Sequence, residues 1–230
     1  MRHTKIAALF AASTLAASAS NIAIVNADFE TGGFGIDAFS NNPGVIPAGW
    51  SAVGPINGAF YGYYNPDNAA YDGTTGSGVG ANMSGPNVFY FGSAATGQGI
   101  QQTLAETFSA NTAYSVVVAV GSRNNAGAFT ASLDVVLLAG ATQIASATFR
   151  NTAFDGTFAD YSLEYAYTPA HFGLIGQPLT IRLLENNSVS AGELDIDNIR
   201  MTAIPEPASA ALLLGLGALG LGVTRRRRVS

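Results

Sequence analysis

The chain has 230 residues, with 10 basic and 15 acidic side chains and no cysteine. The absence of cysteine excludes a disulfide framework, thiolate catalysis and a thiolate-bound metal. Residues 20–203 contain four arginines, no lysine and fourteen carboxylates, so their net charge is near −10. Such a charge repels phosphate and therefore argues against binding to nucleic acid.

The first nineteen residues have the layout of a secretory signal peptide. Arg2 and Lys5 precede the apolar stretch 6–16, and the small residues Ala17 and Ala19 lie just before a cleavage site. Cleavage after Ala19 leaves a mature chain that begins at Ser20. We therefore expect export through the Sec machinery, with residues 1–19 outside the fold.

Short runs of alternating apolar residues dominate residues 20–203, whereas helical periodicity is scarce. Residues 140–142 separate two of these runs with the spacing of a hairpin. The pattern predicts an all-β fold, a single antiparallel β-sandwich of jelly-roll type. About nine strands are expected, at residues 21–26, 87–92, 98–104, 114–120, 133–138, 144–149, 161–167, 179–183 and 193–203.

Residues 31–86 differ, because they are rich in Gly, Asn, Pro and Ser with scattered aromatic side chains. A structureless loop of this length is unusual inside a compact domain, so we expect short strands and functional loops there. Tyr61, Tyr63, Tyr64 and Tyr71 gather in this interval, and exposed rings are a common platform for sugars. Alternatively, these rings close over the sandwich edge as core. Trp50 is interpreted as a packing residue.

Residues 204–230 form a tail with three parts. Pro205, Glu206 and Pro207 come first, an apolar run follows at 208–224, and the basic cluster of Arg225, Arg226, Arg227 and Arg228 comes near the end. The run approaches the ~17–25 residues that a membrane-spanning helix needs, and the arginines favour a cytoplasmic end. The tail resembles the PEP-CTERM sorting signal of Gram-negative bacteria. That resemblance implies transient anchoring in the inner membrane, cleavage by the protease exosortase, and delivery to the cell surface or extracellular matrix. A plain membrane anchor is the alternative.

Three motifs occur together in the mature chain: Asn-x-x-Phe-Glu at 26–30, Pro-x-Gly-Trp at 47–50 and Asp-x-Asp-Asn at 195–198. The set resembles jelly-roll carbohydrate-binding modules and the related Stig cyclases of indole-alkaloid biosynthesis, which use this sandwich with bound calcium. The resemblance to the cyclases implies an enzyme in which Asp197 donates a proton.

The acidic residues near the two ends of the domain suggest a calcium site. The first and last strands of a jelly roll can lie side by side, so Glu30 can meet Asp195 and Asp197. Calcium prefers several oxygen ligands, and we expect it to clip the two ends as a structural ion. Parity places Asp197 on one strand face with Ile199 and Met201, where a charge is costly unless it is paired or bound to metal. The alternative is that these acids are solvated or hydrogen-bonded to nearby backbone.

The residues contain no constellation for another catalytic chemistry, and His171 is interpreted as a solvated loop histidine. We therefore expect a non-enzymatic protein of the cell surface or exopolysaccharide, with a sandwich that binds glycans. One alternative is a Stig-cyclase-like enzyme with Asp197 as its general acid. The other is a structural matrix protein without a ligand.

Overall fold

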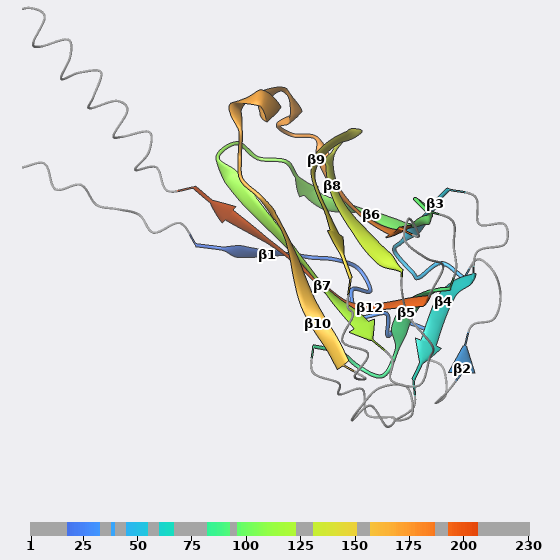
Figure 1. Cartoon of the computed structure of the whole chain (residues 1–230). Coiled ribbons are helices and arrows are strands. Elements are labelled where there is room, and N and C mark those ends of the chain that lie inside the picture. The colour runs from blue at the N-terminus through green and yellow to red at the C-terminus, as the bar shows by residue number, and fades with distance from the viewer. Residues whose placement is uncertain are drawn as a thin grey trace, which may run out of the picture.

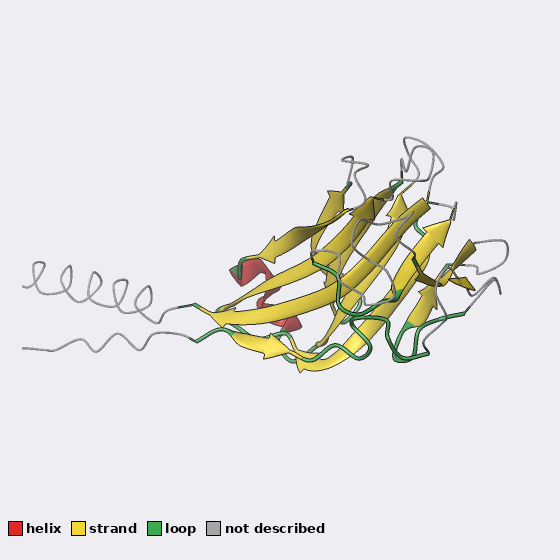
Figure 2. Ribbon diagram, turned by 90° about the horizontal axis from the view of Figure 1, so that it is seen from below, coloured by secondary structure: helices red, strands yellow, loops and turns green. Residues whose placement is uncertain are grey.

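The structure is a computed structural model that describes residues 18–32, 38–39, 45–54, 60–66, 82–92, 96–122, 131–150, 157–186 and 193–206. Its strands form two antiparallel sheets (Figure 1). Figure 2 shows the same strands and, beside them, the short helix at Pro169–Leu174. The prediction of an all-β, two-sheet fold is confirmed.

The larger sheet has seven strands in the order β10-β7-β12-β5-β4-β2, and β1 also pairs with β12. The pairing of β1 with β12 joins the two ends of the domain, with Ser20 opposite Ala203. The strands of this sheet are β1 (Ser20–Ile22), β2 (Ala38–Phe39), β4 (Phe60–Asn65), β5 (Val88–Gly92), β7 (Thr112–Ser122), β10 (Thr157–Tyr165) and β12 (Glu193–Pro205).

The smaller sheet has five strands in the order β3-β6-β11-β8-β9. A short 3₁₀ helix, η1 (Pro169–Leu174), precedes β11, and Pro169 suits its first turn because the ring fixes φ near the helical value. The strands of this sheet are β3 (Ser51–Val53), β6 (Gly99–Thr107), β8 (Ser132–Ala139), β9 (Thr142–Phe149) and β11 (Pro178–Asn186).

Each of the nine expected strands has a counterpart in the structure. β1 is shorter than expected because the chain turns soon after Ile22, with Asn26 and Phe29 at φ values of 48° and 53°. Within residues 31–86, the expected short strands are β2, β3 and β4. The hairpin of β8 and β9 is tight, with Ala139 opposite Thr142, and Gly140 takes a φ of 59° that glycine adopts without strain.

The main core lies between the two sheets and contains a group of aromatic rings. Phe29 packs against Trp50 and Phe89, with ring centroids 6.0 and 5.4 Å away. Trp50 is 7% exposed, and its Nε1 donates a hydrogen bond to the Val25 carbonyl at 3.1 Å. Trp50 is thus a packing residue, as predicted.

Within the described residues, no helix has the length and apolar character needed to cross a membrane. The predicted membrane-spanning run 208–224 and residues 1–17 of the predicted signal peptide lie outside the described residues.

Candidate functional site

The two aspartates of the last strand lie on the outer face of the seven-stranded sheet. Leu194 and Ile196 of β12 belong to the core between the sheets. Because side chains alternate along a strand, Asp195 and Asp197 point the other way. Both aspartates are nevertheless fully buried.

A β-bulge directly after Asp197 changes which residues face the core. The pairing of β12 with β7 skips from Asp197 to Arg200, and Asn198 has a φ of 47°. Ile199 and Met201 consequently belong to the core between the sheets. The prediction that Asp197 shares a face with Ile199 and Met201 is therefore wrong, because the bulge inserts an extra residue and reverses the alternation.

An apolar cluster covers the outer face around these aspartates. Tyr90 on β5 is the direct partner of Asp195, and Ala119 on β7 is the direct partner of Asp197. Both belong to what we call the outer cluster, six buried residues on this face: Tyr64, Met83, Val88, Tyr90, Ala119 and Phe158. The aspartates therefore lie in apolar surroundings rather than in solvent.

Asp197 accepts two hydrogen bonds from the backbone. The Ser84 N–H donates to its Oδ2 at 2.7 Å, and the Asn198 N–H donates to its Oδ1 at 2.6 Å. Burial raises the pKa of Asp197 to about 8; the two hydrogen bonds oppose this rise, and the charges of Glu30 and Asp28 add to it. In the absence of a bound cation, Asp197 is thus mostly protonated at neutral pH.

Glu30 reaches the same region from the turn that follows β1. Asn87 donates to it twice, from the backbone N–H to Oε1 at 2.7 Å and from Nδ2 to Oε2 at 2.6 Å. Burial raises the pKa of Glu30, and the bonds from Asn87 oppose the rise. Gly85 has a φ of 85°, and a β-carbon there would collide with the Glu30 carboxylate. The loop before β5 therefore holds both acids, Glu30 through Asn87 and Asp197 through Ser84.

The predicted metal ligands meet only in part. Glu30 and Asp197 interact electrostatically, and Asp28 adds to their repulsion. Asp195 lies two residues from Asp197, beside Tyr90. In the described ranges, no three His, Cys, Asp or Glu side chains gather closely enough to hold a metal ion. A calcium ion at Glu30 and Asp197 would therefore depend on carbonyl or water oxygens to complete its ligands.

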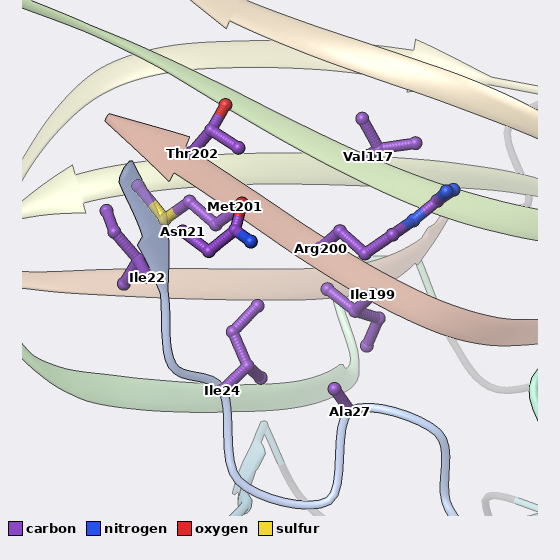
Figure 3. Close-up of a pocket in the computed structure, with 9 residues that line it drawn as sticks. All are labelled: Asn21, Ile22, Ile24, Ala27, Val117, Ile199, Arg200, Met201 and Thr202. Atoms are coloured by element: carbon purple, nitrogen blue, oxygen red, sulfur yellow. The ribbon is translucent and has the colours of Figure 1, made fainter. Parts of the chain in front are cut away.

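A pocket of about 380 Å³ opens next to the bulge, between the N-terminal segment and β12 (Figure 3). Val117 lines this pocket and lies on β7 two residues from Ala119, the partner of Asp197. The pocket therefore begins at the next outward-facing position of β7. Arg200 also lines it and forms an ion pair with Asp160 at 2.6 Å. The lining is mainly apolar: Asn21, Ile22, Ile24, Ala27, Val117, Ile199, Arg200, Met201 and Thr202.

The three described tyrosines of the predicted sugar platform are buried. Tyr61, Tyr63 and Tyr64 are 2%, 3% and 2% exposed. Tyr61 and Tyr63 belong to the core between the sheets, and Tyr64 belongs to the outer cluster. The prediction that these rings are exposed is therefore wrong, because both faces of β4 are covered. Tyr71 lies outside the described residues.

The described processing residues lie at one end of the sandwich. Ala19 directly precedes β1, and β12 ends at Pro205. The Glu206 N–H donates to the Asn111 carbonyl at 2.7 Å. The other predicted processing residues, Ala17, Pro207 and the four arginines at 225–228, lie outside the described residues.

Two known families match the chain. The HpiC1 cyclase family matches residues 20–202, which hold the outer cluster and both aspartates. The chain belongs to the HpiC1 cyclase family. The PEP-CTERM protein-sorting motif matches residues 203–228, which implies an exported, exosortase-processed protein of the cell envelope and surface. Both resemblances inferred from the sequence are thereby confirmed.

Solved structures of Stig cyclases are similar over most of this chain. The Stig cyclase Fisc from Fischerella sp. TAU, in complex with (3Z)-3-(1-methyl-2-pyrrolidinylidene)-3H-indole, is 27% identical with a TM-score of 0.64, covering 82% of this chain and 100% of the other. A Fischerella sp. TAU cyclase in complex with 4-(1H-indol-3-yl)butan-2-one is 27% identical with a TM-score of 0.63, covering 81% and 98%.

Carbohydrate-binding modules are more distant. The CBM22-1 xylan-binding domain of Paenibacillus barcinonensis Xyn10C is 15% identical with a TM-score of 0.42, covering 68% of this chain and 86% of the other. This similarity is too weak to indicate a function. No functionally curated protein matches this chain.

The sequence identified part of the candidate site of this member of the HpiC1 cyclase family. It singled out Asp195, Asp197 and Tyr64, but not Tyr90 or Phe158. The sequence did contain a signal for Tyr90. In the run Val-Phe-Tyr-Phe-Gly at 88–92, the residues that face either side of a strand are apolar, which predicts a strand covered on both faces. Phe158 carries no comparable signal, since its place beside the aspartates comes from the pairing of β10 with β7.

Proposed function

We propose that the mature domain is an exported acid catalyst of the HpiC1 cyclase family, with Asp197 as the proton donor. One observation supports this above all. A fully buried carboxyl lies on a sheet face beside an aromatic, apolar cluster. An apolar pocket opens at the neighbouring strand positions, where it is lined by Val117 and Arg200 and not by Asp197 itself. Apolar surroundings keep such a carboxyl protonated at neutral pH, the state that a general acid needs.

The contacts of Asp197 suit both halves of a proton transfer. In its protonated form the carboxyl gives its proton to the substrate. The carboxylate that remains keeps the hydrogen bonds from the Ser84 and Asn198 N–H groups, which stabilise the negative charge. When the cyclised cation loses a proton, the same carboxylate takes one back. The bulge thus supplies both the orientation of the acid and one donor to its conjugate base.

We infer that the substrate is a small, largely apolar aromatic molecule. The pocket, about 380 Å³, falls in the range of small-molecule sites. The outer cluster offers two tyrosines and a phenylalanine as aromatic contacts. The two Fischerella cyclases named above hold indole compounds. The negative charge of residues 20–203 favours neutral or cationic substrates over anionic ones.

Binding and turnover test this function. The probe 4-(1H-indol-3-yl)butan-2-one is expected to bind the wild-type protein, measured by calorimetry. Asp197→Asn is expected to lower the rate of acid-catalysed cyclisation of an alkenyl indole by about 10²–10⁴-fold while probe binding persists. Asp195→Asn is the matched control on the same strand face. Loss of turnover in Asp195→Asn alone would move the donor to Asp195 and overturn the assignment.

Glycan binding, the leading expectation from the sequence, has less support because its three described tyrosines are buried. A glycan array discriminates between the two functions. Binding to an array glycan without binding of the indole probe would favour a glycan-binding protein. The absence of both would favour the structural matrix protein.

We propose in addition that calcium and a proton are alternative occupants of Asp197. In the calcium-bound form, which is not the acid catalyst, the ion binds through Glu30 and Asp197 and clips the turn after β1 to β12. The charge of Glu30 raises the pKa of Asp197, and this supports a cation there, because a cation between the two carboxyl groups would favour the ionised form of both. The ion would act as a structural clip. It competes with the proton for Asp197, so a calcium-loaded Asp197 is ionised and cannot be the acid.

Calcium is expected to raise the melting temperature, since an ion that binds only the folded state stabilises it by mass action. Thermal melts with calcium and with a chelator measure the effect, and Glu30→Gln and Asp197→Ala are expected to remove most of it. Identical melts in all these samples would contradict the calcium site. A calcium effect that survives both substitutions would place the ion elsewhere.

We also propose that the tail anchors the chain in the inner membrane until exosortase releases it to the cell surface or matrix. The PEP-CTERM match and the apolar run 208–224 support this. Cell fractionation with an epitope inserted within residues 123–130 is expected to find an unprocessed form in the inner membrane and a shorter form outside. A cytoplasmic chain with both ends intact would contradict export.

A further inference from the structure

The end of the sandwich from which the sorting tail leaves is closed by η1. Tyr165, the last residue of β10, pairs with Tyr114 on β7, which pairs with Ala203 on β12. The ring of His171 in η1 stacks on Tyr165 at 5.7 Å, and its Nδ1 is 2.9 Å from the Tyr165 hydroxyl. His171 is thus a packed residue rather than a merely solvated one. We call this region the exit end, and Figure 2 shows η1 toward the end of the sandwich at which β12 finishes.

Exposed apolar side chains gather at the exit end. In the part of the chain that the structure describes, four large hydrophobic side chains are exposed, and three belong here. They are Phe172 at 70%, Ile175 at 40% and Ile204 at 41% exposure. Single exposed hydrophobic residues are common, but a group at one end marks an interaction surface.

This apolar end also lacks positive charge. Residues 165–178 contain no Asp, Glu, Lys or Arg, and residues 107–113 contain none either. The nearest charged positions along the chain are acidic, Glu106, Glu164 and Glu206. The surface therefore suits an uncharged partner and not an anionic one.

The backbone around η1 is pinned to the domain. The Gly176 N–H donates to the Phe108 carbonyl, and the Phe108 N–H donates to the Gln177 carbonyl, both at 2.8 Å. The ring of Tyr167 stacks on that of Phe108 at 6.2 Å. Phe172 is thus presented outward from a fixed turn, while the neighbouring aromatic rings pack inward.

The start of the apolar tail lies within a short reach of this surface. Glu206 is bonded to Asn111, and the apolar run begins at Ala208, two residues later. Two residues span at most about 7 Å. When the run is inserted in a bilayer, the exit end consequently lies at the depth of the lipid headgroups, which border the ~30 Å hydrocarbon core.

We propose that the exit end is a membrane-contact surface, and that Phe172 and Ile175 insert into the headgroup region of a zwitterionic bilayer while the tail is anchored. This holds the domain in one orientation at the membrane before processing. It rests on the membrane anchoring proposed above and is independent of the proposed acid catalysis.

The full chain can be labelled at single sites because it contains no cysteine. Phe172→Cys carries an environment-sensitive fluorophore, and the chain is reconstituted in phosphatidylcholine vesicles with or without nitroxide-labelled lipid. Thr96→Cys is the matched control, because Thr96 is exposed and precedes β6 at the end opposite Thr107. Fluorescence is measured on the fraction that floats with the vesicles.

The emission of the fluorophore at 172 is expected to shift to shorter wavelengths and to be quenched several-fold by nitroxide-labelled lipid. The emission of the fluorophore at 96 is expected neither to shift nor to be quenched. Equal behaviour of the two labels in the floating fraction overturns the proposal and leaves the anchor intact. A blue shift at 172 without lipid quenching indicates a protein partner and also overturns it. If no fraction floats, the anchor itself fails, and the membrane contact fails with it.

Discussion

Asp197 is buried, as the sequence predicted, but it lies on the other face of its strand. The alternation predicted a buried position, but on the core face. The bulge places it on the outer face instead, in contact with the loop before β5 through the Ser84 N–H. Its chemistry therefore depends on that loop and on Glu30, and not on the packing between the sheets.

The pKa of Asp197 predicts how stability depends on pH. Its folded-state value of about 8 lies above the ordinary value of 3.8. Such a group contributes stability that is fully present below pH ~4 and is lost as the pH rises through about 8. The free energy of unfolding is thus expected to fall between pH 5 and pH 8 without calcium, by at most about 4 kcal/mol. Urea unfolding at both pH values measures it.

Asp197→Asn provides the control for this prediction, because the amide does not titrate. In this variant the decrease in unfolding free energy between pH 5 and pH 8 is expected to be much smaller. Saturating calcium is expected to reduce the same decrease in the wild type, because it holds the carboxylate ionised. Equal pH dependence in wild type and variant would show that Asp197 has an ordinary pKa.

At the scale of elements, the loop between Asn82 and Asn87 joins the two halves of the candidate site. It bonds Asp197 through Ser84 and Glu30 through Asn87. Asn82 extends these contacts, since its Nδ2 donates to the Phe158 carbonyl at 3.0 Å. The loop thus connects Glu30 and Asp197 through hydrogen bonds to each acid.

Gly85→Ala tests this coupling. The substitution is expected to destabilise the fold by more than the ~1–2 kcal/mol of a left-handed alanine, because its β-carbon collides with the Glu30 carboxylate. Gly97→Ala is the matched control, with a φ of 84° and no atom within 4 Å of the added carbon. Thermal melts compare the two. Equal losses would mean that the Glu30 side chain moves aside freely.

At the scale of the whole molecule, the fold was largely predictable and the site only in part. Alternation along the chain placed nine of the strands, because each strand carries its own pattern of burial. The outer cluster was not predictable, since Met83 and Phe158 meet the aspartates only through loop and strand pairing. For Tyr61, Tyr63 and Tyr64 the sequence left two readings open, and burial of all three favours the one in which the rings close over the sandwich as core.

The pairing of β1 with β12 has a consequence for export. Among the described strands, the first strand of the mature domain pairs with the last one, with Ser20 opposite Ala203. In export through the Sec channel, which the signal peptide predicts, the N-terminus passes first, and the partner of β1 arrives almost at the end of translocation. Contacts between such distant residues form slowly. The pairing of β1 with β12 is thus expected to form late. Until then the chain stays incompletely folded, which is the state in which it can pass through the channel.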